Sequence, residues 1–355
     1  MSFRTRRVLF ITPFYMLFQF FLLKYIFSLF FEVDTLYLLI ATVFIGLMHC
    51  LPMFFESKKS TVVGRFFSTV DGVWMWASVM FLIDIIVIYL IWSLIDLSLE
   101  IRCLLLSVVP ILAIYNYYNA HKLVVSQETL FIDNLHHDVN IAHLSDVHFG
   151  SVCHKQIIES IASKLKELED ECHLAIISGD LADGSSCVLE DDFHSLSEVN
   201  MPIIFTPGNH DFYSSIGNVL KACKKAGIIV LDNNSVELEG LNIFGLTFSY
   251  EDRSAPKLEK SVINPDLVNV LNYHVPYYWE EFSKLGFDLQ LSGHTHGGQF
   301  YPVVWFANLI FKYNMGLFKN NLGKYLHVTT GVGSMDVPMR WGTSSEIVIL
   351  KLKKR

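Results

Sequence analysis

The sequence predicts an α/β protein in two parts: N-terminal transmembrane α-helices, followed by a layered α/β/α sandwich with mixed sheets. Composition gives the first observation, because the 355-residue chain is 52% apolar and only 17% charged, whereas a soluble domain is about 25% charged. Nearly all of this deficit in charge lies before residue 120. After residue 120, short apolar runs alternate with amphipathic helical patterns, which is typical of layered α/β folds.

Four apolar runs occupy the first third of the chain: residues 8–31, 35–55, 73–95 and 101–119. Each is close to the ~20 residues that cross a bilayer. The first is too long for a signal peptide and lacks a small-residue cleavage site. We therefore interpret residues 1–120 as a membrane anchor with about four transmembrane helices, and residues 121–355 as a separate folded domain.

Basic side chains gather at one set of ends of these runs: Arg4, Arg6, Arg7, Lys58, Lys59 and Arg65. The positive-inside rule then places the N-terminus and the 56–72 loop in the cytoplasm. Four spans return the chain to that side, which predicts a multi-pass integral protein of the inner or plasma membrane with a cytoplasmic catalytic domain. The fourth run is the weakest because it begins at Arg102. If it does not span, the C-terminal domain lies on the other side.

Asp84 is the most deeply placed ionisable residue in these runs. Intramembrane ionisable groups often mark functional sites, and helix packing is the alternative for Asp84. The runs lack the paired Gly/Pro interruptions of transporters. This favours an anchor over a transporter with an attached regulatory domain.

Charge and cysteine content exclude further classes of protein. The net charge of -8 argues against a nucleic-acid partner held by a basic field. Six cysteines are present without a C-x-x-C motif, which argues against a disulfide framework or a structural zinc site.

The C-terminal part shows strands and helices in alternation, and its ~230 residues suffice for a large core. Predicted strands are 123–125, 129–132, 139–144, 174–177, 203–205, 236–238, 241–246, 267–273, 289–291, 325–329 and 346–350. Predicted helices are 156–169, 189–199, 214–226 and 276–284. The helix 156–169 carries apolar residues at spacings of three and four, and 236–246 reads as a hairpin across Glu239-Gly240.

Polar residues follow five of the predicted strands at the point where each strand ends. They are Asp146, His148, Asp180, Asn209, His210, Asp211, His274, His294 and His296. In open α/β sheets, ligands bind at the carboxyl ends of strands. Because residues i and i+2 of a strand face the same way, the pairs Asp146/His148 and His294/His296 can each present two ligands to one point.

This donor set predicts a metal centre. Carboxylate, imidazole and one amide oxygen suit Mn²⁺, Fe or Zn²⁺ better than Ca²⁺. The seven candidate ligands (the nine residues above without His210 and Asp211) exceed one tetrahedral site. They fit two metals ~3.5–4 Å apart that share a bridging carboxylate.

The motifs around these residues are Asp146-Val147-His148, Gly179-Asp180-Leu181-Ala182-Asp183, Gly208-Asn209-His210-Asp211, the lone His274 and Gly293-His294-Thr295-His296. In order and spacing they resemble the signature of the calcineurin-like metallophosphoesterases, whose domain would cover about residues 135–355. The resemblance implies a four-layer α/β/β/α sandwich. With membrane spans in front, the chain is similar to the membrane-anchored bacterial branch, which is similar to UDP-2,3-diacylglucosamine hydrolases.

The resemblance also implies a role for each residue. Asp146, His148, Asp180 and His296 would hold one metal, and Asp180, Asn209, His274 and His294 the other, so that Asp180 bridges. His210, oriented by Asp211, would lie beside the scissile phosphate and donate a proton to the leaving oxygen. A metal-bridging hydroxide would attack phosphorus in line.

Two further segments are candidates for substrate contact. Arg340 follows a Gly-rich turn and could bind a substrate phosphate, or could form a surface ion pair. Residues 302–319 are largely apolar and include Trp305 and Phe306. They could form a core helix, or an interfacial flap that lies on the bilayer and admits an acyl chain.

The leading hypothesis is a membrane-anchored, two-metal phosphoesterase or pyrophosphatase acting on a lipid-linked phosphate such as UDP-2,3-diacylglucosamine. A phosphodiesterase for small soluble substrates is one alternative. A metal-binding scaffold or sensor without turnover is another, and hydrolysis of a chromogenic phosphodiester with Mn²⁺ separates it from an enzyme. The expected partners are the lipid bilayer and a phosphorylated substrate.

Overall fold

The structure is a computed structural model of the chain that describes residues 3–56, 59–213, 215–250 and 254–354. Its contacts divide the chain into two compact units. One comprises Met1–Asn119 with Asp336–Met339, and the other comprises Ala120–Met335 with Arg340–Arg355.

The first unit is built from helices. They are α1 (Phe3–Ser28), α2 (Thr35–Phe55), α3 (Val62–Trp92), α4 (Leu99–Leu106) and most of α5 (Val108–His121). Among the described residues, four stretches are long and apolar enough to cross a membrane: Val8–Ser28, Thr35–Phe55, Val62–Trp92 and Leu99–His121. The last comprises α4 and α5. By their length and composition, these helices indicate a membrane protein.

Helix α3 begins eleven residues before the predicted run, at Val62 instead of residue 73. Its start is fixed by Thr61, whose hydroxyl accepts a hydrogen bond from the Gly64 NH, as in a normal N-cap. At 1.5 Å per residue, its 31 residues measure about 46 Å, more than the ~30 Å hydrocarbon core. Of the basic residues expected at this side, Lys58 lies outside the described residues.

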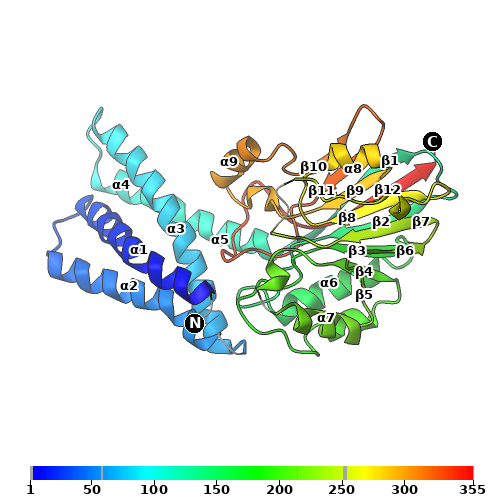
Figure 1. The fold of residues 1–355 in the computed structure, drawn as a ribbon. Coiled ribbons are helices and arrows are strands. Elements are labelled where there is room, and N and C mark those ends of the chain that lie inside the picture. Colours follow the sequence, from blue (N-terminus) through cyan, green and yellow to red (C-terminus); the bar gives the residue numbers. More distant parts are fainter. Residues whose placement is uncertain (1–2, 57–58, 214, 251–253, 355) are drawn as a thin grey trace. The chain divides into compact units, whose positions relative to one another are not determined.

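The second unit contains two six-stranded sheets (Figure 1). The first has the order β1 (Leu123–Ile132), β12 (Ser345–Lys354), β2 (Val139–Leu144), β3 (Leu174–Ser178), β4 (Ile203–Thr206) and β5 (Ile229–Val230). The second has the order β10 (Gly316–Lys319), β11 (Tyr325–Val328), β9 (Leu289–Ser292), β8 (Val268–Tyr273), β7 (Leu241–Leu246) and β6 (Asn234–Leu238). Both are mixed, as predicted: β2, β3, β4 and β5 run parallel, whereas β12 is antiparallel to β2.

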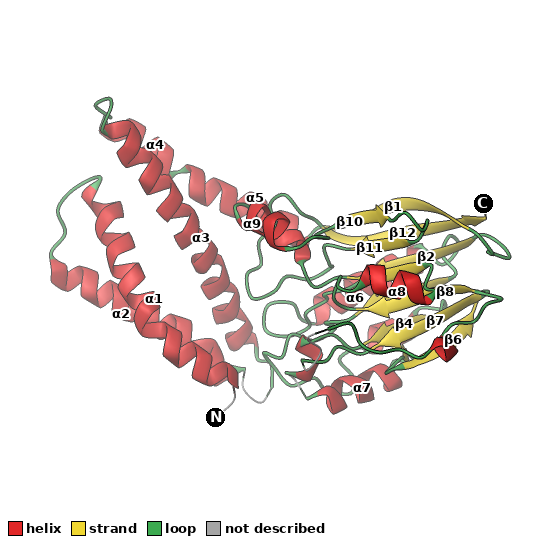
Figure 2. Cartoon of the chain, turned by 45° about the horizontal axis from the view of Figure 1, so that its top comes forward, coloured by secondary structure: helices red, strands yellow, loops and turns green. Residues whose placement is uncertain are grey.

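Helices lie on both outer faces of the sheet pair, with the strands between them (Figure 1), and Figure 2 shows the helices in red and the strands in yellow. Side chains alternate along β2: Ala142 and Leu144 pack toward α6 (Lys155–Glu167) and α7 (Ile216–Lys225). Val139 and Ile141 instead enter the core between the two sheets. On the far side, α8 (Trp279–Leu285) packs Phe282 against the second sheet. The predicted four-layer α/β/β/α fold is confirmed.

Two predicted elements are wrong in detail. Residues 189–199 form only a short 3-10 turn at His194–Glu198, because the carboxylate of Asp192 accepts from the Leu189 NH and closes a local turn instead. The strands 123–125 and 129–132 are one strand, β1, since every residue from Leu123 to Ile132 pairs with β12. The other predicted elements of this unit are present with ends shifted by up to four residues. The predicted start of the helix 214–226, residue 214, lies outside the described residues. The sequence did not predict β5, β10 or a defined α9 (Val303–Ile310).

Candidate metal centre

The seven candidate ligands come together at the carboxyl ends of five strands. Asp146 and His148 follow β2, Asp180 follows β3 and Asn209 follows β4 in the first sheet. In the second sheet His274 follows β8, and His294 and His296 follow β9. Because β2, β3 and β4 are parallel to one another, and β8 is parallel to β9, each sheet delivers its ligands to one edge.

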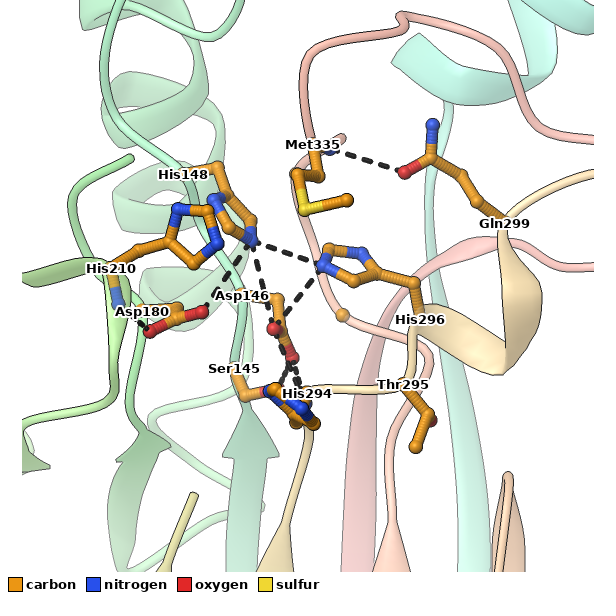
Figure 3. Close-up of polar contacts among 12 residues, drawn as sticks. Ser145, Asp146, His148, Asp180, His210, His294, Thr295, His296, Gln299 and Met335 are labelled. Carbon is orange, nitrogen blue, oxygen red and sulfur yellow. Dashed lines mark hydrogen bonds and ion pairs between the residues drawn. The ribbon is translucent and has the colours of Figure 1, made fainter. Parts of the chain in front are cut away.

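One group of ligand atoms comes from Asp146, His148 and His296 (Figure 3). The Asp146 Oδ1 lies 3.3 Å from the His296 Nε2 and 3.7 Å from the His148 Nε2. The two imidazole Nε2 atoms are 3.0 Å apart. All three side chains are buried, so these three atoms face one small space.

A second group comes from Asp180, His274 and His294. The Asp180 Oδ2 lies 3.1 Å from the His274 Nε2, and the His294 Nδ1 lies 3.3 Å from the same nitrogen. The Asn209 Oδ1 is 3.1 Å from the His294 Nδ1. Because the Asp180 Oδ2 is also 3.8 Å from the His148 Nε2, Asp180 joins the two groups.

These spacings fit metal ligands. Two donors that each lie 2.0–2.2 Å from one ion are separated by roughly 3–4 Å, and the atom pairs above are separated by 3.0 to 3.8 Å. With their protons removed, these imidazole nitrogens and carboxylate oxygens would present lone pairs to one point, which a shared cation would stabilise. The residues present therefore fit a pair of divalent ions.

Backbone strain is concentrated at this centre. Asp146, His148, Asp180, His294 and His296 have φ between 49° and 74°. Residues other than glycine rarely adopt this left-handed backbone conformation. Those that do adopt it cluster at functional sites. The expectation that Asp146/His148 and His294/His296 alternate within strands is wrong, because β2 ends at Leu144 and β9 at Ser292. Left-handed turns, and not strand geometry, aim these side chains.

Two glycines allow the ligands to approach. A Cβ at Gly293 would lie 2.2 Å from the Asp146 Oδ2, and one at Gly208 would lie 2.3 Å from the Asp180 Oδ1. Any larger residue would push a carboxylate out of place. The glycine in the G-N-H-D and G-H-T-H motifs is therefore a steric requirement of the centre.

The imidazoles of His274, His294 and His296 differ in their pKa and therefore in their charge at pH 7. Burial opposes a charged imidazole at His274, yet the carboxylate of Asp180 raises its pKa to about 9. Burial, together with His274, lowers the pKa of His294 to about 4. Burial also lowers the pKa of His296 to about 3. The last two are neutral at pH 7 and can offer a lone pair, whereas a metal at His274 must displace a proton.

His210 lies beside the ligands, and its ring centroid is 4.8 Å from that of His148. The prediction that Asp211 orients His210 is wrong. Both carboxylate oxygens of Asp211 accept backbone NH groups, from Asp180 at 2.9 Å and from Ala182 at 2.9 Å. The His210 Nδ1 lies 3.1 Å from the carbonyl oxygen of Asp183. Asp211 thus holds the loop, and a main-chain carbonyl orients His210.

Arg340 does not reach toward a substrate, nor does it form a surface ion pair. Its side chain is fully buried, and its guanidinium donates to backbone carbonyls, among them those of Thr330 and Ser344, both at 2.8 Å. These hydrogen bonds offset part of the cost of burying the charge, which would be large if the guanidinium had no acceptors. The sequence did not reveal these hydrogen bonds, because every residue has a backbone carbonyl and no residue type marks the ones that accept.

Helix α9 (Val303–Ile310) carries the other proposed substrate residues. Trp305 and Phe306 are 63% and 59% exposed, whereas Val304 on the opposite side is 1% exposed. Phe311, directly after the helix, places its ring 6.3 Å from that of His294. The segment is therefore a surface helix that leads to the metal centre, and the prediction of a core helix is wrong.

A polar layer that the sequence did not predict lies between the sheets beneath the ligands. His143 contacts His327 and the Ser178 hydroxyl, at 2.7 and 2.8 Å. The Ser178 hydroxyl donates to Asn272, and the Ser178 carbonyl oxygen lies 2.7 Å from the His274 Nδ1. This carbonyl fixes the imidazole so that its Nε2 points to the centre.

Comparison with known proteins agrees with this site. The family model described as calcineurin-like phosphoesterase matches residues 139–298. A protein of Campylobacter jejuni named an uncharacterized metallophosphoesterase is 32% identical over 266 residues, which cover 72% of this chain and 70% of that protein. One of Helicobacter pylori with the same description is 28% identical over 237 residues. These cover 64% of this chain and 63% of that protein, so the chain spans less than two thirds of that relative.

Two further comparisons concern the membrane helices and the fold. A zebrafish (Danio rerio) protein named a transmembrane protein with metallophosphoesterase domain is 26% identical over 275 residues, covering 71% of this chain and 62% of that protein. The solved structure of the NAD nucleotidase of Haemophilus influenzae matches 56% of this chain and 46% of that chain, with 17% identity and a TM-score of 0.37. On the family model and the Campylobacter relative, together with the ligand groups, this chain belongs to the calcineurin-like metallophosphoesterase family.

Proposed function

We propose that this protein is a membrane-anchored phosphoesterase that uses two metal ions to hydrolyse a phosphodiester or pyrophosphate bond of a lipid-linked substrate. The observation that carries the proposal is the overlap of three groups of possible ligands: Asp146-His148-His296, His148-Asp180-His210 and Asp180-His274-His294. Because Asp180 and His148 each belong to two groups, the site suits two adjacent ions and not one.

The ions would be Mn, Fe or Zn, the metals that suit mixed imidazole and carboxylate donors. Asp146, His148, Asp180 and His296 would hold one, and Asp180, Asn209, His274 and His294 the other. Bound there, they would lower the pKa of a water toward neutrality and stabilise charge on the phosphoryl oxygens.

His210 supports the proton transfer. A carbonyl oxygen can only accept a hydrogen bond, so the contact with Asp183 requires a proton on the His210 Nδ1. The Nε2 is then the nitrogen available to the substrate. A protonated His210 could give its Nε2 proton to the leaving oxygen as that bond to phosphorus breaks.

A lipid-linked substrate is supported by α9 and by the anchor. Beyond Trp305 and Phe306, Leu309 and Ile310 are 83% and 75% exposed. Such a row of apolar side chains on a surface helix suits the interfacial region of a bilayer. The resemblance to UDP-2,3-diacylglucosamine hydrolases points to the same class of substrate. A small soluble phosphodiester is the alternative outcome.

The proposed topology places both the N-terminus and the catalytic unit in the cytoplasm, with the protein crossing the membrane four times. Support comes from the basic residues at one set of helix ends, including Arg65 near the start of α3. It also comes from four helices of sufficient length and apolarity.

The test uses full-length protein in detergent with Mn²⁺. Asp180→Asn should lower the bound metal measured by elemental analysis and abolish nearly all hydrolysis of bis(p-nitrophenyl) phosphate, because it removes the carboxylate shared by both groups. The exposed Asp170→Asn should change neither quantity. Wild-type metal content and rate in Asp180→Asn would exclude the two-metal site, and metal binding without any wild-type turnover would identify a scaffold or sensor.

A further inference from the structure

Arg340 is a buried cation with an unusual set of partners. Its side chain is 0% exposed, although arginine is almost never fully buried unless paired. The Nη2 donates to the carbonyl oxygens of Thr330, Gly331 and Gly333, at 2.8, 3.1 and 2.5 Å. The Nη1 donates to the Ser344 carbonyl at 2.8 Å. The planar guanidinium therefore binds three carbonyls of one loop, residues 329–333, and links this loop to the turn before β12.

The 329–333 loop in turn holds the backbone of a candidate metal ligand. The NH of Val332 donates to the Ser145 carbonyl at 3.0 Å, and the NH of Gly333 donates to the Asp146 carbonyl at 2.8 Å. Asp146 and His148 have left-handed φ values of 51° and 49°. Backbone in that region persists only where its surroundings fix it.

The 329–333 loop also packs tightly against Asp146 and Val147. A Cβ at Gly331 would lie 2.7 Å from the Asp146 Cβ, and one at Gly333 would lie 2.0 Å from the Val147 carbonyl oxygen. These approaches are closer than any real side chain allows. A shift of the loop must therefore move the turn that carries Asp146 and His148.

We infer that Arg340 is a positioning residue of the metal centre. It fixes the 329–333 loop, and the loop holds the left-handed turn that aims the Asp146 Oδ1 and the His148 Nε2 at the His296 Nε2. The role needs arginine, because its rigid fork can serve several carbonyls at once, whereas lysine offers a compact point charge. The inference rests on the metal centre of the proposed function, but not on its substrate.

The experiment compares Mn²⁺ affinity in two variants of the full-length protein in detergent. Arg340→Lys keeps the positive charge but removes the planar guanidinium that donates to several carbonyls at once. Leu352→Ala is the matched control: Leu352 is also buried, but it pairs with Val139, at the opposite end of β2 from Asp146 and about 20 Å away at 3.3 Å per residue. Both variants should lower the melting temperature of the metal-free protein.

Arg340→Lys should bind Mn²⁺ about 10- to 100-fold more weakly, the usual cost of losing a support behind a metal ligand. It should also change the visible spectrum of the Co²⁺-loaded protein, which reports ligand geometry. Leu352→Ala should leave both unchanged. Equal Mn²⁺ affinity in Arg340→Lys and wild type, or equal loss in Leu352→Ala, would overturn the inference.

If Arg340→Lys does not fold, Gly331→Ala tests the step that the inference requires, the coupling between the loop and the turn that carries Asp146, because its new methyl group presses on Asp146. Reduced Mn²⁺ affinity supports that coupling, and wild-type affinity overturns the inference. Activity of the wild-type protein toward bis(p-nitrophenyl) phosphate is measured separately. Its absence would count against the proposed phosphoesterase, and not against the role of Arg340 in metal binding.

Discussion

The exposed face of α9 gives the sharpest test of the lipid-linked substrate. The change is the double substitution Trp305→Ala with Phe306→Ala, which removes two aromatic rings from the surface near the metal centre. Their exposed fractions are 63% and 59%. Since an aromatic side chain offers roughly 150–250 Å², the pair leaves about 250 Å² of apolar surface in water.

The size of the expected effect follows from this area. At about 25 cal/mol per Å², complete transfer of the two rings from water to an acyl chain or bilayer would contribute about 6 kcal/mol. If lipid covers half of the surface, the loss is about 3 kcal/mol, which corresponds to roughly 100-fold in an equilibrium constant. A small water-soluble phosphodiester makes no such contact, so its turnover should change less than about threefold.

The assay measures kcat/KM for a lipid phosphodiester in mixed micelles and for bis(p-nitrophenyl) phosphate, with the same full-length protein and Mn²⁺. Val304→Ala is the matched control, since Val304 lies on the same helix but is only 1% exposed. Its truncation disturbs packing and should affect both substrates alike. If the double substitution also slowed both substrates equally, α9 would be a packing element and the reasoning about lipid would fail.

Four further predictions concern the site and the anchor. His210→Ala should keep its bound metal but lose about 10²–10⁴-fold in turnover, because it removes the proton donor; an unchanged rate on a substrate with a poor leaving group would contradict this role. Affinity for Mn²⁺ should rise from pH 6 to pH 8, because in the metal-free protein the pKa of His274 is raised to about 9 and the metal must displace that proton. The raised pKa of His274 also means that its ion pair with Asp180 stabilises the metal-free fold fully below about pH 6.5, and that this stabilisation is lost as the pH rises toward 9. The melting temperature of the metal-free protein should therefore fall over this range, and a rise would contradict the ion pair. A reporter fused after residue 355 that is active only outside the cytoplasm should stay silent, and a signal would mean that one of the four stretches, Leu99–His121 first among them, does not span.

Much of the fold and the identity of the candidate ligands followed from local patterns in the sequence. Apolar runs of about 20 residues predicted membrane helices because length and composition alone satisfy the bilayer. The G-D, G-N-H-D and G-H-T-H motifs indicated the candidate ligands because metal chemistry restricts donors to a few residue types. The short apolar runs before each motif placed those donors at strand ends, where parallel strands bring them to one edge.

The tertiary structure decided how those residues are held. Arg340 was expected at a substrate or on the surface, and long-range packing puts it behind Asp146 instead. His210 is oriented by the Asp183 carbonyl, and His274 by the Ser178 carbonyl. Every residue carries such a carbonyl, so no sequence pattern marks the ones that matter. Which carbonyls face a guanidinium or an imidazole depends on contacts between segments far apart in the chain, and these exist only once the two sheets have packed.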